Sequence, residues 1–191
     1  AREMCIRDRT WADNRSSRYA DLIENEYNGF EIYQRTGTPL HPMSPLSKIF
    51  WMKHEQPAIY NQTAKFADIK TYIFYQLFDK YVIDYSMASA TGMFNLEQLD
   101  WDEKALKLLG ISRDQLPELV PTTHILTGMK KRFAELMDID ENTPVVVGAS
   151  DGVLSNLGVN SYKKGEVAVT IGTSGAIRTA VSYTHLRAHE T

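Results

Sequence analysis

The sequence predicts an α/β fold in which helices cover a mixed sheet. Two observations support this prediction. Apolar segments of strand length alternate along the chain with segments whose apolar residues recur at helical spacing. The second half then places a strand, a helix and a two-stranded hairpin in succession between residues 145 and 177. Such alternation is typical of layered α/β domains, because each helix buries an apolar face against a sheet.

The composition is that of a globular protein. With 191 residues, 24% charged and 43% hydrophobic, the chain can bury a sizeable core. A net charge of −3 gives no indication of nucleic-acid binding, and we see no apolar stretch long enough to cross a bilayer. The single cysteine, Cys5, cannot form an internal disulfide, which favours a reducing, cytoplasmic setting.

Local signals predict the first helices. A short helix of mixed polarity is expected over 17–27, followed by a loop over 36–42 that is rich in helix breakers. Ser44 is expected to cap a second helix, with Pro45 at its first position, where a missing N–H group is tolerated. His41, in the loop before it, is best explained as a solvated histidine.

Asp68 is expected to begin the longest helix of the chain. Three aliphatic residues recur at helical spacing and should face the core together with their aromatic neighbours. They are Ile69, Ile73 and Leu77, with Tyr72, Phe74, Tyr75 and Phe78.

The middle of the chain carries clear boundary signals. A strand is expected over 93–96, and a helix over 103–109 should end at Gly110 in a left-handed cap. Ser112 and Gln115 have the spacing of a capping box.

A further strand and helix precede the central strand. The strand is expected around Ile125, and the helix spans 130–137. In that helix Phe133, Leu136 and Met137 should face inward.

The segment from 143 to 178 carries the strongest indications of function. A buried strand over 145–147 leads through Gly148 to Asp151 at the start of a helix, and a hairpin follows with its turn at 172–175. Glycines and hydroxyl groups in that turn would let the backbone approach an anion. Alternatively, Ser150 and Asp151 only cap the helix, and the turn is an ordinary hairpin turn. The glycine spacing fits a dinucleotide-binding turn poorly.

Near the N-terminus, Trp11, Asp13 and Arg15 form a Trp-x-Asp-x-Arg segment. An indole face and a nearby carboxylate suit a polyhydroxylated ligand, because the ring covers C–H groups while the carboxylate accepts hydroxyl hydrogen bonds. In the alternative, Trp11 belongs to the core and Asp13 pairs with Arg15 or Arg18 at the surface.

These segments, and above all VVVGASDG followed by VAVTIGTSGAIR, resemble the FGGY family of sugar and polyol kinases over about residues 10 to 180. The resemblance implies an actin-like (ribonuclease H-like) ATPase fold, of which this chain would hold part. It assigns 10–148 to the later part of the N-terminal, sugar-binding domain and 149–180 to the interdomain catalytic segment and the first hairpin of the C-terminal domain. Residues 1–9 and 181–191 are interpreted as non-native tails.

The resemblance also implies roles for single residues. Asp151 would be the general base that takes the proton of the substrate hydroxyl. Trp11, Asp13 and Gly152 would contact the substrate beside it. The phosphates of ATP would be bound by Gly172, Thr173 and Ser174.

The expected activity is ATP-dependent phosphorylation of a sugar acid, with gluconate converted to 6-phosphogluconate. Xylulose, ribulose or glycerol as substrate, and a noncatalytic actin-like nucleotide-binding protein, are the alternatives. Mg²⁺ is expected as cofactor, with its ligands largely in an N-terminal Asp-x-Gly-Thr loop that this sequence lacks, so the chain alone is expected to be inactive. A homodimer of the full-length protein is left open, and neither nucleic acid nor membrane is expected as a partner.

No metal site is expected within this sequence. His185 and His189 have the spacing of a helical metal pair, but neither a third ligand nor a glutamate motif accompanies them.

Overall fold

The structure is a computed structural model, and it describes residues 13–171 and 175–179. The chain divides into two compact units, residues 1–147 and 148–191. We describe each unit by itself.

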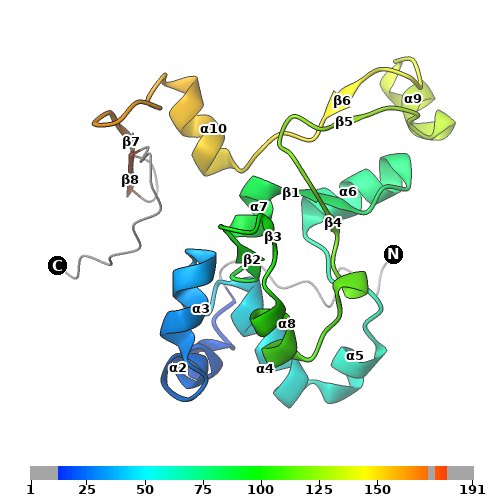
Figure 1. Ribbon diagram of the computed structural model, residues 1–191. Helices are drawn as coiled ribbons and strands as arrows, with labels where there is room; N and C mark the ends of the chain where they lie inside the picture. Colours follow the sequence, from blue (N-terminus) through cyan, green and yellow to red (C-terminus); the bar gives the residue numbers. More distant parts are fainter. Residues whose placement is uncertain (1–12, 172–174, 180–191) are drawn as a thin grey trace. The chain divides into compact units, whose positions relative to one another are not determined.

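Helices predominate in the first unit (Figure 1). They are α2 (Ser17–Glu26), α3 (Gly29–Thr36), α4 (Pro45–Glu55), α5 (Pro57–Gln62), α6 (Ile69–Phe78), α7 (Tyr85–Ser89), α8 (Glu103–Leu109), the 3₁₀ turn η1 (Arg113–Gln115) and α9 (Lys131–Met137). The sequence predicted α2, α4, α6, α8, η1 and α9, but not the short α3, α5 and α7. The described α4 has eleven residues and α6 has ten, so the prediction that the helix after Asp68 is the longest was wrong.

The described strands of the first unit are short and form three pairs. Strand β1 (Val82–Asp84) pairs in parallel with β4 (Glu118–Val120). The other two pairs, β2 (Phe94–Asn95) with β3 (Asp100–Trp101) and β5 (Ile125–Leu126) with β6 (Val145–Val146), are antiparallel. The α/β class is confirmed. The predicted mixed sheet is not present in the described residues, because their strands form separate pairs, each either parallel or antiparallel.

Several predicted caps are present in the structure. The Ser44 side chain accepts a hydrogen bond from the Ser47 amide at the start of α4, and Asp68 does the same for the Thr71 amide at the start of α6. Helix α8 ends at Gly110, whose φ is 76°. The capping box between Ser112 and Gln115 is formed. Each cap satisfies a backbone group that the helix itself leaves without a partner.

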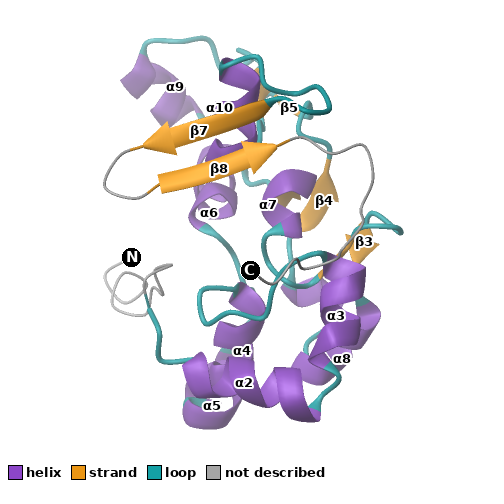
Figure 2. Ribbon diagram, turned by 90° about the vertical axis from the view of Figure 1, so that its left-hand side faces the viewer, coloured by secondary structure: helices purple, strands orange, loops and turns teal. Residues whose placement is uncertain are grey.

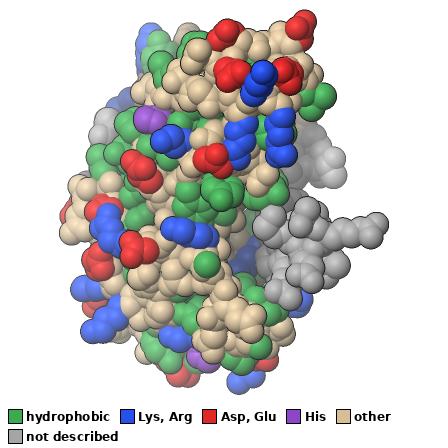
Figure 3. Space-filling view, turned by 90° about the vertical axis from the view of Figure 1, so that its right-hand side faces the viewer, with side chains coloured by type: hydrophobic (Ala, Val, Ile, Leu, Met, Phe, Trp, Pro, Cys, Tyr) green, Lys and Arg blue, Asp and Glu red, His purple; other side chains and the backbone are tan. Residues whose placement is uncertain are grey.

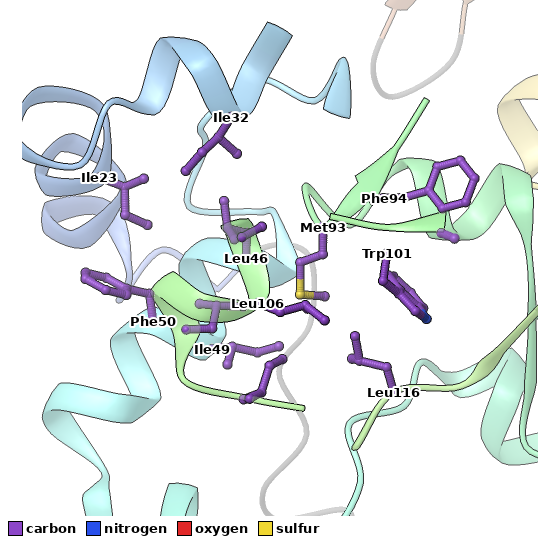
Figure 4. Close-up of a cluster of buried hydrophobic side chains, with 14 of the residues drawn as sticks. Ile23, Ile32, Leu46, Ile49, Phe50, Met93, Phe94, Trp101, Leu106 and Leu116 are labelled. Atoms are coloured by element: carbon purple, nitrogen blue, oxygen red, sulfur yellow. The ribbon is translucent and has the colours of Figure 1, made fainter. Parts of the chain in front are cut away.

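Two apolar clusters form the core of the first unit. The larger one joins α2, α3, α4 and α8 to β2 and β3, and Figure 4 shows its side chains converging between these elements. Among them are Ile23, Ile32, Leu46, Phe50, Phe94, Trp101 and Leu106. The smaller cluster lies between α6, α9 and the strands β1, β4 and β5, and its buried residues include Phe74, Phe78 and Ala134. Figure 2 shows the helices of the larger cluster gathered at one end of the unit.

Two helices present only part of the predicted face to the core. In α6 Phe74 and Phe78 are buried and Leu77 packs against the smaller cluster, as predicted. Ile69, however, is 70% exposed, and Ile73 is 47% exposed. Because this helix is apolar on nearly every side, periodicity alone does not select its inward face.

In α9 the prediction holds for Phe133, which packs against the smaller cluster beside the buried Ala134. It was wrong for Leu136, which is 80% exposed, and for Met137, which also faces outward. In Figure 3 hydrophobic side chains are interspersed with charged ones on the side of the molecule where Figure 1 draws α6 and α9. The expected burial of the strand over 145–147 holds for Val147, but Val146 is exposed.

The second unit contains one helix and one hairpin in its described part. Helix α10 spans Asp151–Gly158, and strands β7 (Val167–Ile171) and β8 (Gly175–Thr179) are antiparallel partners. These elements match the predicted helix and hairpin. In the described residues of the chain, no helix is long and apolar enough to cross a membrane.

Candidate functional site

Asp151 is placed at a strand-to-helix corner by its local sequence. After Val147 the chain passes through Gly148, whose φ of 73° is in the left-handed region that glycine adopts readily. Ser150 is in an extended conformation at the N-cap, and Asp151 is the first residue of α10. Its side chain is exposed, and one carboxylate oxygen accepts a hydrogen bond of 2.7 Å from the Gly152 amide. The structure thus presents a carboxylate at the start of a helix, where the helix dipole stabilises negative charge.

The predicted phosphate-binding turn connects the two strands of the hairpin. Ile171 and Gly175 are paired at the end of the ladder. Gly172, Thr173 and Ser174 between them lie outside the described residues. Among the described residues, the nearest atom to a Cβ added to Gly175 would be the Thr170 carbonyl oxygen, at 3.9 Å. No described atom therefore crowds the backbone at this end of the hairpin.

Arg178 of β8 lies against the first turn of α10. A Cβ atom built on Gly152 would be 3.3 Å from Nε and 3.9 Å from Cζ of Arg178. The guanidinium also donates a hydrogen bond of 3.1 Å from Nη1 to the Thr170 hydroxyl on β7. The hairpin and the Asp151 corner are thus neighbours within the second unit. Arg178 was not predicted as a site residue, although it is a lone cation at the end of an apolar strand.

Asp13 belongs to the first unit and is paired with Arg15. Its carboxylate accepts hydrogen bonds from Arg15 Nε at 2.9 and 3.1 Å and also from Nη2 and the backbone amide of Arg15. These hydrogen bonds raise the pKa of Arg15 above its ordinary value. The pairing is the surface alternative considered for Asp13, but its side chain is only 14% exposed. Trp11 lies outside the described residues.

Helix α4 surrounds this pair with further groups. The Arg15 guanidinium carbon lies 5.0 Å from the centre of the Trp51 ring, within cation–π range. Lys48, one turn earlier on α4, is 8% exposed, and burial lowers its pKa while the charge of Asp13 raises it. Two cations therefore lie near one carboxylate, a cluster that the Trp-x-Asp-x-Arg spacing alone did not reveal.

The loop before α4 is attached to the same segment. The Ser16 hydroxyl donates a hydrogen bond of 2.8 Å to the Pro42 carbonyl. His41 is exposed, and its Nδ1 accepts a hydrogen bond of 3.1 Å from the Met43 amide. This geometry agrees with the solvated loop histidine expected from the sequence.

Among the described residues, no group of three or more His, Cys, Asp or Glu side chains could hold a metal ion. His185 and His189 lie outside those residues, so the structure does not bear on them.

Residues 5–158 match the N-terminal domain of the FGGY family of carbohydrate kinases. Over 172 residues, or 90% of the chain, the sequence is 62% identical to a gluconokinase of Bacillus subtilis, and it covers 34% of that protein. The chain thus spans about a third of the length of the curated relatives it matches.

The fold also matches solved structures of sugar kinases. Crystal structures of a gluconate kinase and of a ligand-bound xylulose kinase, both from Lactobacillus acidophilus, each superpose with a TM-score of 0.86 at 39% identity. Each alignment covers 89% of this chain and 35% of the other. The predicted actin-like ATPase fold, present in part, is confirmed by these similarities.

Proposed function

Since this chain belongs to the FGGY family of carbohydrate kinases, we propose that it is part of an ATP-dependent kinase that phosphorylates gluconate. The similarity to the Bacillus gluconokinase and to the Lactobacillus gluconate kinase supports gluconate as the substrate. The observation that carries the proposal is the exposed Asp151 carboxylate at the start of α10, with the β7–β8 hairpin against the same turn.

In this proposal Asp151 is the general base. Its carboxylate accepts the proton of the substrate hydroxyl while that oxygen forms a bond to the γ-phosphorus. The bond from the γ-phosphorus to the bridging oxygen breaks, and ADP leaves with the electron pair. A positioned base of this kind contributes about 10²- to 10⁴-fold in rate. Positioning and charge stabilisation supply much of the remainder in phosphoryl transfer.

We assign Trp11, Asp13 and Gly152 to the substrate side of the site. The paired hydrogen bonds from Arg15 to the Asp13 carboxylate support this role, because they hold the carboxylate in one orientation. Gly152, the residue after Asp151, has no side chain, and the Arg178 side chain approaches the space that a Cβ atom would occupy there.

We assign Gly172, Thr173 and Ser174 to the phosphates of ATP. No atom of the described residues crowds Gly175 at the end of the hairpin, which fits an approach of this kind. When bound, ATP supplies the phosphoryl group and Mg²⁺ neutralises its charge. We assign no Mg²⁺ ligand to the described residues, which hold no cluster suited to one. A cytoplasmic location and a homodimer of the full-length protein remain predictions.

The test uses the complete gene product. Asp151→Asn should lower kcat for gluconate by about 10²-fold or more, with little change in ATP affinity. Asp21→Asn, at an exposed position on α2, is the matched control and should retain activity. Unchanged turnover in Asp151→Asn would remove Asp151 from the role of base.

Two further assays address the substrate and the chain itself. A panel of gluconate, xylulose, ribulose and glycerol distinguishes the related kinases, and gluconate should have the highest kcat/KM. A protein that binds ATP but phosphorylates none of them would be the noncatalytic alternative. The 191-residue chain alone should show no turnover, and measurable phosphorylation by it would contradict our view that the remaining site residues lie elsewhere.

A further inference from the structure

Arg178 is the charged residue on one face of the hairpin, where the other side chains are small. In the register of the ladder, Ala168 pairs with Arg178 and Thr170 pairs with Ala176. Because side chains alternate along a strand, these four residues share one face. The other three are alanine or threonine, and Ala168 is buried. The strands β7 and β8 are drawn next to α10 in Figure 2.

The guanidinium is held at the corner that carries Asp151. Nε lies 3.3 Å from the position that a Cβ atom of Gly152 would occupy, and Gly152 directly follows Asp151. Nη1 donates to the Thr170 hydroxyl at 3.1 Å, which fixes the side chain from the hairpin side. Arg178 is half-buried. Its orientation is therefore set by contacts from two elements.

A cation in this place is electrostatically unfavourable by itself. The N-terminus of a helix carries partial positive charge and stabilises anions. Arg178 adds a full positive charge beside the first turn of α10, and Asp151 offsets it by one negative charge. A phosphoryl group in transfer carries more than one negative charge and suits the planar, multi-donor guanidinium.

We propose that Arg178 is a second catalytic residue, whose guanidinium donates hydrogen bonds to the phosphoryl group during transfer. The inference rests on the proposed kinase function. As the substrate oxygen loses its proton to Asp151 and bonds to phosphorus, charge develops on the phosphoryl oxygens and on the departing ADP. Arg178 stabilises that charge and exchanges no proton or electron pair itself.

The carboxylate of gluconate is a less suitable partner for Arg178. In 6-phosphogluconate the phosphorylated hydroxyl and the carboxylate are at opposite ends of the six-carbon chain. A cation beside the first turn of α10, which begins at the proposed base, therefore suits the reacting end. We therefore expect Arg178 to affect the rate of phosphoryl transfer and not the affinity for gluconate.

The experiment measures single-turnover phosphorylation of gluconate by the complete kinase. Arg178→Met should lower the transfer rate by about 10²- to 10³-fold, the loss typical of removing one donor to a transition-state charge. The KM for gluconate should change little. Arg132→Met, at an exposed position on α9, is the control and should keep the wild-type rate. A rate within about threefold of wild type in Arg178→Met would overturn the inference.

Two readouts separate a catalytic role from a structural one. Millimolar guanidinium should restore part of the rate in Arg178→Ala, because it can occupy the vacated space. The variant should also bind ADP with aluminium fluoride less tightly than wild type, while its affinity for ADP alone is unchanged. If guanidinium restores nothing and both affinities fall equally, Arg178 supports the fold and the inference is wrong. Failure of the wild-type enzyme to phosphorylate gluconate would instead refute the proposed function.

Discussion

Replacement of Asp102 by alanine should strongly destabilise the first unit. Asp102 is 2% exposed and is the N-cap of α8, where it accepts a hydrogen bond of 2.8 Å from the Ala105 amide. It also accepts hydrogen bonds from Arg35 Nε at 2.7 Å, from Arg35 Nη2 at 3.1 Å and from Asn95 Nδ2 at 3.2 Å. One carboxylate therefore connects α3, β2 and α8 beside the larger core cluster.

The magnitude follows from the groups that lose their partner. Loss of the cap costs about 1 kcal/mol. The Arg35 side chain is 23% exposed and the Asn95 side chain is buried, so each loses a partner that water only partly replaces, at about 1–2 kcal/mol apiece. The sum, about 3–5 kcal/mol, equals the usual effect of breaking a buried ion pair on one side. With a urea m-value of about 2 kcal/mol per molar, the midpoint should fall by about 1.5–2.5 M.

The assay is urea unfolding of the chain followed by tryptophan fluorescence, with Trp101 as a probe inside the cluster. Asp21→Asn, exposed on α2, serves as the control and should leave the midpoint in place. A double-mutant cycle with Arg35→Met should give a coupling free energy of about 1–3 kcal/mol between the two charges. A midpoint shift below about 0.5 M in Asp102→Ala would refute the reasoning, because it would mean that water replaces the carboxylate at little cost.

Three further predictions follow from the structure. Burial raises the pKa of Asp102, but hydrogen bonds from Arg35, the Ala105 amide and Asn95 outweigh it and hold the pKa below its ordinary value. The ionised Asp102 should therefore contribute its full stabilisation above about pH 4, and this contribution should be lost as the pH falls through the lower pKa of the folded state. The urea midpoint of wild type should then fall more steeply with acid than that of Asp102→Ala. Gly29→Ala should cost about 1–3 kcal/mol in urea unfolding, because its Cβ would be 2.5 Å from the Glu24 Cα. Gly158→Ala should be nearly neutral, because its Cβ would meet no described atom within 4 Å apart from its own stretch of helix. Leu136→Ala on α9 should change the unfolding free energy by less than about 0.5 kcal/mol, because Leu136 is exposed, whereas Leu109→Ala on α8 should cost about 2–5 kcal/mol, because Leu109 is buried. The reverse order would contradict the inward face described for α9.

Helix ends were the most predictable features of the fold. Ser44, Asp68, Gly110 and the Ser112 capping box act within their own helix termini, and the structure contains all of them. A cap depends on residues three or four positions apart, so the sequence holds nearly all the information that forms it.

Inward faces were less predictable. In α6 the whole apolar set was expected inside, and Phe74 and Phe78 are buried, but Ile69 and Ile73 are exposed. Because this helix is apolar on almost every side, the choice depends on which strands lie beside it. In α9 Phe133 and Ala134 pack against the smaller cluster, which leaves Leu136 exposed.

In the candidate site too, features formed by neighbouring residues were predicted, whereas a contact between distant residues was not. The strand, Gly148 and Ser150 that lead to Asp151 are adjacent in the sequence, and the predicted strand-to-helix corner is present, although the Ser150 side chain forms no capping hydrogen bond. Arg178 follows Asp151 by 27 positions, and its contact with Gly152 depends on how the hairpin packs on α10. The role of Asp151 as base remains a prediction for the complete protein.

The sequence by itself determined most of the longer helices, several helix caps, the C-terminal hairpin and the position of a carboxylate at a strand-to-helix corner. These features depend on backbone preferences and on hydrogen bonds between residues close in the chain. The tertiary structure alone decided which face of α6 and α9 is buried, that Arg15 holds Asp13, and that Arg178 lies beside Gly152. Such contacts join residues through packing in space, and neither periodicity nor local spacing encodes that packing directly.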